Sequence, residues 1–100
     1  MKLLLFTRKG CCICDTLKSN LSKIDILKIA NNLTIEEIDI DRFDLYQNKF
    51  RKYDFEVPVL ALQYDNSKEY VELPRVSPRI KEINLSNWLK KNINNVFQNL

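Results

Sequence analysis

Residues 2–17, "KLLLFTRKGCCICDTL", place an apolar run, a basic turn and a group of cysteines in direct succession. Segment 2–7 is rich in apolar residues and is closed by "RKG", which predicts a short buried strand. All three cysteines of the chain, Cys11, Cys12 and Cys14, follow at the point where a helical pattern starts. The chain therefore brings its thiols to the junction of a strand and a helix.

Apolar residues continue at helical spacing after the cysteines, which predicts a helix over residues 12–30 that the asparagines at 31–32 end. Its stripe, with spacings of four, three and three, consists of Leu17, Leu21, Ile24 and Leu27. "LTIEEIDI", residues 33–40, predicts a second strand anchored by Ile35 and Ile38.

The second half of the chain predicts two helices and two strands. Aromatic residues spaced by three, four and three predict a helix formed around Phe43, Tyr46, Phe50 and Tyr53. "VPVLALQY", residues 57–64, predicts a third strand that begins at a proline, and the turn at 65–67 joins it to "EYVEL", residues 69–73, as a hairpin. The last helical stripe contains Leu85, Trp88, Leu89, Ile93, Val96 and Phe97.

The predicted order is β-α-β-α-β-β-α, a pattern typical of an α/β fold. Two strands joined through a helix are expected to be parallel, and the final pair is expected to form an antiparallel hairpin. We therefore expect a four-stranded mixed sheet flanked by helices, in a single domain over residues 1–100. Tyr46, Phe50 and Trp88 lie at helical spacing and are interpreted as core residues rather than as a ligand site.

Composition excludes several classes of function. Basic and acidic residues number 16 and 13 and are intermixed, so the formal charge of +3 gives no reason to expect nucleic-acid binding. The chain has no histidine, which excludes Ser-His and Cys-His catalysis and histidine-containing zinc sites. A single glycine, Gly10, excludes glycine-rich phosphate loops.

The apolar run near the N-terminus is too short for a signal peptide, whose apolar region spans roughly 7–15 residues. No stretch approaches the ~20 apolar residues of a membrane helix. We therefore expect a cytoplasmic protein without membrane contact. Clustered cysteines in that compartment are more often catalytic or metal-binding than structural.

Cys11 and Cys14 form a C-x-x-C pair at the expected start of the first helix. Positions i and i+3 are neighbours in a helical turn, so the two sulfurs can reach disulfide distance. The unpaired N–H groups and the partial positive charge of a helix N-terminus stabilise a thiolate on the first cysteine. Arg8 and Lys9 add positive charge on the approach side.

These features resemble the glutaredoxin and thioredoxin superfamily, and most closely the small bacterial glutaredoxin-like proteins with a G-C-x-x-C-[DE] motif. "LLLFTRKGCCICDTL" is similar to the first strand, active-site loop and helix of that family, "VPVLAL" to the strand that opens with its cis-proline, and "LPRVSPRI" to its ending. The resemblance implies a thioredoxin-like fold and a thiol–disulfide oxidoreductase. It implies that Cys11 is the nucleophile, that Cys14 is the resolving thiol, and that Val57 before cis-Pro58 pairs with the substrate backbone.

The expected disulfide is Cys11–Cys14, because a bond between the adjacent Cys11 and Cys12 would distort the peptide that joins them. Cys12 occupies a variable position of the motif. It is interpreted as a surface thiol, with an alternative disulfide partner or a site of glutathione capture left open.

Substrate recognition is less closely matched to the family. Glutathione-dependent relatives carry a Gly-Gly turn and an Asp after the fourth strand, whereas "LPRVSPR" here contains no glycine. Arg8, Arg75 and Arg79 are predicted to bind substrate, with charges that converge around Cys11, while ordinary solvated arginines remain the alternative. The expected partners are protein disulfides or glutathione mixed disulfides, with glutathione a candidate co-substrate, no bound cofactor or metal, and a monomeric chain.

Two other functions remain open from sequence. A thioredoxin-fold module could use the dithiol to sense redox state or to bind proteins, with no significant turnover. A metal site on the three cysteines is disfavoured, because three thiolates leave a fourth position empty and adjacent ligands strain a tetrahedral geometry.

Overall fold

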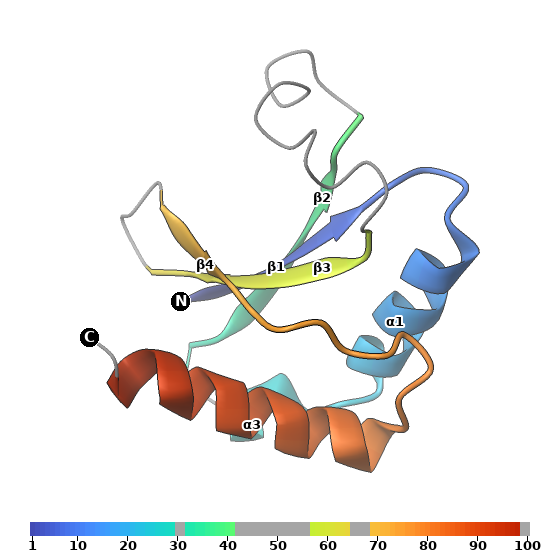
Figure 1. Cartoon of the computed structure of the whole chain (residues 1–100). Helices are drawn as coiled ribbons and strands as arrows, with labels where there is room; N and C mark the ends of the chain where they lie inside the picture. Colours follow the sequence, from blue (N-terminus) through green and yellow to red (C-terminus); the bar gives the residue numbers. More distant parts are fainter. Residues whose placement is uncertain (30–31, 42–56, 65–68, 99–100) are drawn as a thin grey trace.

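A computed structural model describes residues 1–29, 32–41, 57–64 and 69–98. The elements, shown in Figure 1, are β1 (Lys2–Thr7), α1 (Cys12–Ser22), the 3₁₀ helix η1 (Ile26–Lys28), β2 (Thr34–Asp39), β3 (Val59–Gln63), β4 (Tyr70–Glu72) and α3 (Glu82–Gln98). The predicted α/β fold is confirmed. The predicted helix around Phe43, Tyr46, Phe50 and Tyr53 and the turn at 65–67 lie outside the described residues.

The four strands form one mixed sheet in the order β2-β1-β3-β4. β1 is parallel to β2 and antiparallel to β3, and β3 is antiparallel to β4. Both predicted pairings, the parallel pair and the final hairpin, are confirmed. The central position of β1 means that the loop at its carboxyl end lies between the ends of β2 and β3.

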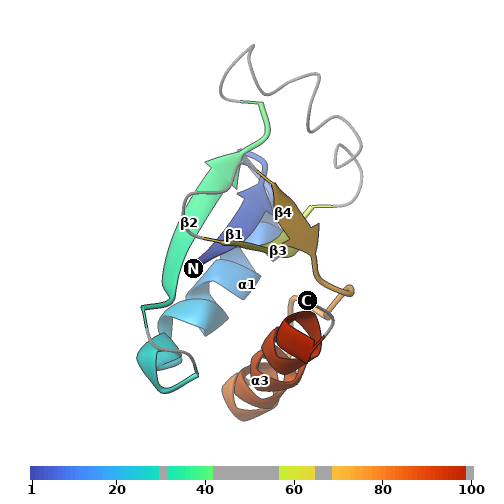
Figure 2. The same ribbon diagram turned by 90° about the vertical axis from the view of Figure 1, so that its left-hand side faces the viewer.

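β1 is buried on both faces, which explains its uninterrupted apolar run. Leu3 and Leu5 point to the face covered by α1 and α3, which lie together on one side of the sheet in Figure 2. Leu4 and Phe6 point to the opposite face, because side chains alternate along a strand. On the helical face the core also contains Leu17, Leu21, Leu33, Leu60, Leu62, Leu73, Leu85, Leu89 and Ile93.

α1 ends at Ser22, eight residues earlier than the apolar spacing predicted. The Ser22 hydroxyl donates to the Ser19 carbonyl at 2.6 Å, a local bond of the kind that competes with helical hydrogen bonds. Asp25 then adopts an extended backbone and is the N-cap residue of η1. Ile24 nevertheless packs against the core, so the helical spacing indicated burial correctly although the helix itself stops.

The edge strand β2 is less buried than the central strands β1 and β3. Ile35 of β2, expected to anchor its strand, is 37% exposed because β2 is paired on one side only. Ile38, the other expected anchor, packs against the face that holds Leu4 and Phe6.

α3 confirms the last predicted stripe within its described side chains. Leu85, Leu89 and Ile93 are buried, and Trp88 packs against them as a core residue. In the described parts of the chain, no helix combines the length and the apolar character needed to cross a membrane.

Candidate active site

The loop between β1 and α1 is a tight turn that depends on Gly10. Gly10 has a φ of +80°, a backbone conformation that residues with a Cβ rarely adopt. The Cys11 N–H donates to the Arg8 carbonyl at 3.1 Å and closes the turn. The chain therefore leaves the sheet and enters α1 within four residues, which places Cys11 at the carboxyl end of the central strand.

Cys11 caps the N-terminus of α1. Its Sγ accepts a hydrogen bond from the Cys14 N–H at 3.2 Å, and its carbonyl accepts the first helical bond from the Asp15 N–H at 3.2 Å. A side-chain acceptor at this position satisfies one of the unpaired amides of a helix N-terminus. The same amide and the helix dipole favour negative charge on the sulfur, so this geometry suits a thiolate nucleophile.

Cys14 lies one turn further and is 2% exposed, buried in the first turn of α1. Cys11 and Cys14 are joined as a disulfide with their Cα atoms 5.3 Å apart, which confirms the predicted pairing. Cys12 is exposed and outside the disulfide. Within the described segments, no three His, Cys, Asp or Glu residues gather as metal ligands.

The Val57–Pro58 peptide bond is cis, as predicted. The antiparallel pairing of β1 with β3 ends at Phe6 and Val59, so Val57 and Pro58 lie beside the chain where it leaves β1 for the cysteine loop. Both residues are half-buried, and Val57 packs against the core face that contains Phe6. The register therefore brings the proline to the same end of the sheet as the dithiol.

Arg8 is held by Asp41, a residue that the sequence did not single out. Its Nε and Nη2 atoms donate to the two Asp41 oxygens at 2.5 and 3.0 Å. The Ile40 N–H donates to the Thr7 carbonyl at 3.0 Å and extends the β1–β2 pairing, which brings Asp41 alongside Arg8. The guanidinium lowers the pKa of the Asp41 carboxyl, chiefly through the hydrogen bond.

A second group of polar residues behind the dithiol was also missed. Glu37 of β2 accepts a hydrogen bond from the buried Thr7 hydroxyl at 3.2 Å. It also forms an ion pair with the Lys18 ammonium at 2.6 Å. The hydrogen bond and the charge of Glu37 raise the pKa of Lys18. One carboxylate thus connects β1, β2 and α1 near the residues that lead into the cysteine loop.

The other two arginines predicted to bind substrate, Arg75 and Arg79, lie in separate surroundings. Arg75 follows β4 and pairs with Glu72 at 3.4 Å. Arg79 is exposed on the connection from β4 to α3, and its N–H donates to the Ser77 hydroxyl at 3.3 Å. Arg8 and Arg75 therefore have carboxylate partners within the chain, and the expected convergence of charge around Cys11 remains a prediction.

Comparisons with known proteins identify the family and support the fold. The model of the family described as Glutaredoxin-like domain (DUF836) matches residues 2–90. A solved structure described as "Structure of a malarial protein" is similar in fold, with a TM-score of 0.56 and 19% sequence identity over 92% of this chain and 96% of that chain. No curated protein matches the chain.

Proposed function

The chain belongs to the glutaredoxin-like family, and we propose that it is a thiol–disulfide oxidoreductase that works through Cys11 and Cys14. The observation that carries this proposal is the capping geometry of Cys11. Its sulfur accepts the Cys14 N–H at the start of α1, and the second sulfur lies within disulfide distance but away from solvent. An accessible, stabilised thiolate beside a buried thiol is the arrangement that two-step disulfide exchange requires.

In the first step the Cys11 thiolate attacks one sulfur of a substrate disulfide. The S–S bond of the substrate breaks, a new bond joins Cys11 to that sulfur, and the other substrate sulfur leaves as a thiolate that takes a proton from water. The α1 N-terminus favours the attacking form before the reaction and loses its negative partner when the mixed disulfide forms.

In the second step Cys14 gives up its proton to water and attacks Cys11 Sγ. The remaining substrate sulfur leaves as a thiolate and is protonated, and the protein retains the Cys11–Cys14 disulfide. Two electrons have passed from the two cysteines to the substrate; Cys14 has released one proton to water, and both product thiols have taken their protons from water. An external thiol or dithiol must then reduce the Cys11–Cys14 disulfide before a second turnover.

Substrate recognition is proposed at the carboxyl end of β1. The Val57 backbone, placed beside the cysteine loop by the β1–β3 register, offers main-chain groups to a substrate segment. Cis-Pro58 shapes that surface, and Arg8, Arg75 and Arg79 are proposed to favour anionic substrates. The proposed substrates are protein disulfides and glutathione mixed disulfides. The proposed enzyme is a cytoplasmic monomer that works without a bound cofactor.

The decisive experiment measures reduction of a peptide disulfide with dithiothreitol as the reductant. We expect Cys11→Ser to remove turnover entirely. Prereduced Cys14→Ser, mixed with the peptide disulfide in the absence of dithiothreitol, is expected to stop after the first step and to accumulate a mixed disulfide at Cys11, visible as a mass increase. Cys12→Ser is the matched control, because it removes an exposed thiol from the same turn, and it should react as the wild type does.

The same experiment separates this proposal from a redox-sensing or protein-binding module. Such a module would show a defined reduction potential for the Cys11–Cys14 disulfide but no multiple turnover. If peptide reduction by the wild type does not exceed that of Cys11→Ser, the oxidoreductase proposal is wrong.

A further inference from the structure

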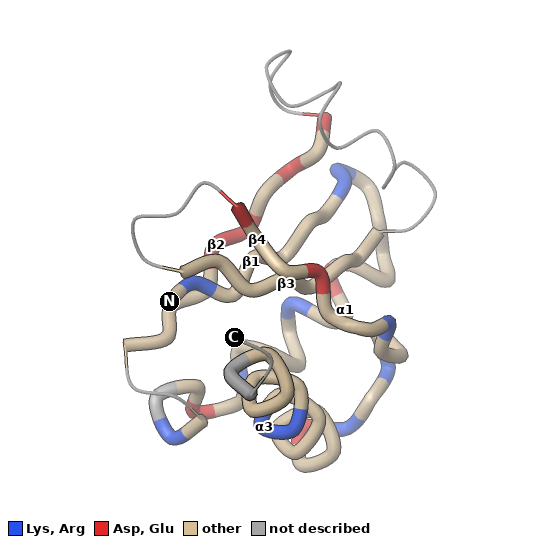
Figure 3. Tube along the Cα trace, turned by 60° about the vertical axis from the view of Figure 1, so that its left-hand side comes forward, with Lys and Arg blue, Asp and Glu red and all other residues tan. Residues whose placement is uncertain are grey.

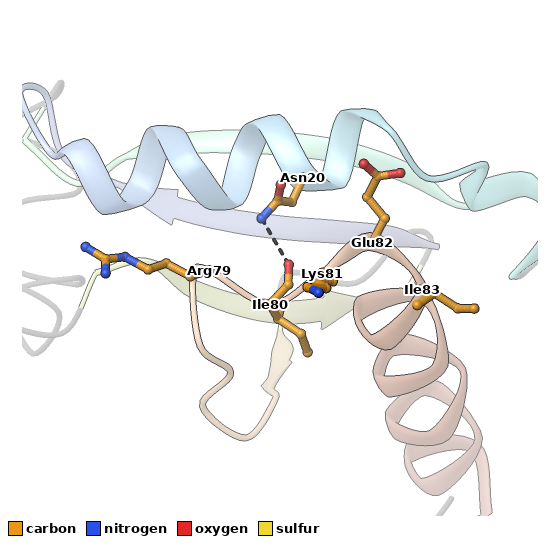
Figure 4. Close-up of a pocket in the computed structure, with 6 residues that line it drawn as sticks. All are labelled: Asn20, Arg79, Ile80, Lys81, Glu82 and Ile83. Carbon is orange, nitrogen blue, oxygen red and sulfur yellow. Dashed lines mark hydrogen bonds between the residues drawn. The ribbon is translucent and has the colours of Figure 1, made fainter.

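A groove of about 450 Å³ lies between the last turns of α1 and the start of α3, separate from the cysteine loop. It is lined by Asn20, Arg79, Ile80, Lys81, Glu82 and Ile83, which Figure 4 shows as sticks. The Arg79 side chain extends along α1 in this view toward the end at which the helix begins. The Arg79 side chain therefore extends from the groove in the direction of the dithiol.

Hydrogen bonds hold the walls of this groove in place. The Asn20 side-chain amide donates to the carbonyls of Pro78 and Ile80 at 3.2 and 3.1 Å, and so ties α1 to the connection that precedes α3. Ile80 packs against the core, and the Leu85 N–H donates to the Lys81 carbonyl at 2.8 Å. The groove is thus a preformed feature of the fold, and a ligand would not have to order it.

The charges around the groove are mainly positive. Residues 74–81 contain no acidic side chain, and Figure 3 shows basic residues spaced along this connection. Arg79 and Lys81 are exposed, and the one carboxylate of the lining, Glu82, faces Lys23 at 3.8 Å. Because Lys23 offsets Glu82, the charges of Arg79 and Lys81 remain to attract an anionic partner.

An apolar side chain, Ile83, also lines the groove and points away from Arg79 in Figure 4. Ile83 is 71% exposed, whereas the other exposed large hydrophobic residues among the described ones reach at most 44%. A single exposed isoleucine is ordinary on a protein surface. Next to a groove with two cations, however, it supplies the apolar contact that protein interfaces combine with a charged rim.

We propose that this groove binds an acidic segment of a protein substrate while the substrate disulfide reacts at Cys11. This inference rests on the proposed oxidoreductase function and adds a class of substrate to it. Asn20 lies eight positions after Cys12, which corresponds to about 12 Å of helix at ~1.5 Å per residue. An extended peptide covers that distance in about four residues at ~3.3 Å each. The acidic residues are therefore expected about four to six positions from the substrate cysteine.

Two peptides of identical composition test the position of the acidic residues. Each contains one cysteine in a mixed disulfide with 2-mercaptoethanol and two Glu-Leu-Glu segments, one on each side of the cysteine. In the first peptide these segments lie about five residues from the cysteine. In the second they lie directly beside it. We expect the wild type to give a several-fold higher kcat/KM for the first peptide, mainly through a lower KM. Equal values for both peptides would overturn the proposal.

Two double variants test the site. Arg79→Gln with Lys81→Gln should lower kcat/KM for the preferred peptide about fivefold, since each exposed charge pair contributes modestly. Lys90→Gln with Lys91→Gln removes the same charge from exposed positions of α3 outside the groove and should have no comparable effect. An equal loss in both double variants would show that net charge, and not the groove, attracts the peptide.

A binding measurement separates the groove from the chemistry. Fluorescence anisotropy with the same peptides carrying serine in place of cysteine reports docking without any disulfide. Binding that is weakened by the Arg79 and Lys81 substitutions, together with absent turnover, would contradict the oxidoreductase function and leave the groove supported. Turnover of both peptides without any difference in binding would refute the groove and leave the oxidoreductase function intact.

Discussion

Arg8, just before α1, holds the Asp41 carboxylate with two hydrogen bonds, whereas Arg79, in the connection before α3, lines an open groove and extends toward the start of α1 (Figure 4). A bidentate pair orients the guanidinium and offsets its charge within the fold. An exposed guanidinium that lines a groove can still attract an anionic group of a binding partner. Arg8 is thus fixed within the fold by its carboxylate partner, and we propose that Arg79 contributes more to substrate recognition than Arg8 does.

The largest expected difference between the two regions is in stability. Leu17 of α1 is 1% exposed within the core, so Leu17→Ala should lower the free energy of unfolding by about 2–5 kcal/mol. Ile83→Ala, in the groove, should change it by no more than about 0.5 kcal/mol. Urea denaturation of both variants measures this, and a similar loss in the two would mean that Ile83 supports the fold.

The next difference concerns the thiols at the start of α1. Cys11 has the capping position, so in the reduced protein it should react with iodoacetamide roughly tenfold faster than Cys12 near neutral pH. A brief, substoichiometric pulse followed by mass mapping gives the ratio. Label found mostly on Cys12 would make the assignment of the nucleophile wrong.

The Arg8–Asp41 pair should give a smaller, pH-dependent effect. The folded-state pKa of Asp41 is lowered from 3.8, so its stabilising contribution is complete above that value and is lost as the pH falls through the lowered pKa. Asp41→Asn should therefore destabilise the protein at pH 7, by up to about 1 kcal/mol because the pair is solvent-screened.

Acid titration of the unfolding free energy provides the check. The wild type and Asp41→Asn should converge as the pH is lowered. A difference between them that stays constant across the acid range would mean that the substitution acts through something other than the charge of Asp41.

The smallest expected effect distinguishes Arg79 from Arg75. Arg75 pairs with Glu72, so Arg75→Gln should alter the salt dependence of turnover with an anionic disulfide less than Arg79→Gln does. We expect about a twofold reduction in salt sensitivity for Arg79→Gln, and little response to salt with a neutral disulfide. Equal effects of the two substitutions would remove the distinction between paired and exposed arginines.

The sequence predicted the central strands and the dithiol well because those signals are local. A run such as Leu3–Phe6 is apolar whichever face it points to, since β1 is covered on both sides. In a C-x-x-C pair at a helix start, the helical turn itself brings the two sulfurs close together, so the pairing can be predicted from the spacing. The end of α1 was predicted less well, because Ile24 keeps the apolar spacing while Ser22 and Asp25 change the backbone.

The polar contacts around the site could not be predicted in the same way. Arg8 and Asp41 are 33 positions apart, and Thr7 and Glu37 are 30 apart. Each pair depends on the register between β1 and β2, which the local pattern does not specify. An acidic residue directly after a strand parallel to β1, such as Asp41, was the available signal. The groove depends similarly on the amide contacts of Asn20 with a segment about 60 positions away.

The capping role of Cys11 has a consequence for how this position evolves. Serine, aspartate and asparagine are the side chains that best start a helix, so selection for stability alone would favour one of them there. Under the proposed function, a cysteine at this place reflects selection for reactivity at the expense of the helix start, a trade-off that recurs where function and folding use the same atom. Lineages that lose the proposed chemistry would be free to acquire an oxygen cap, and the residue at position 11 would then record that loss.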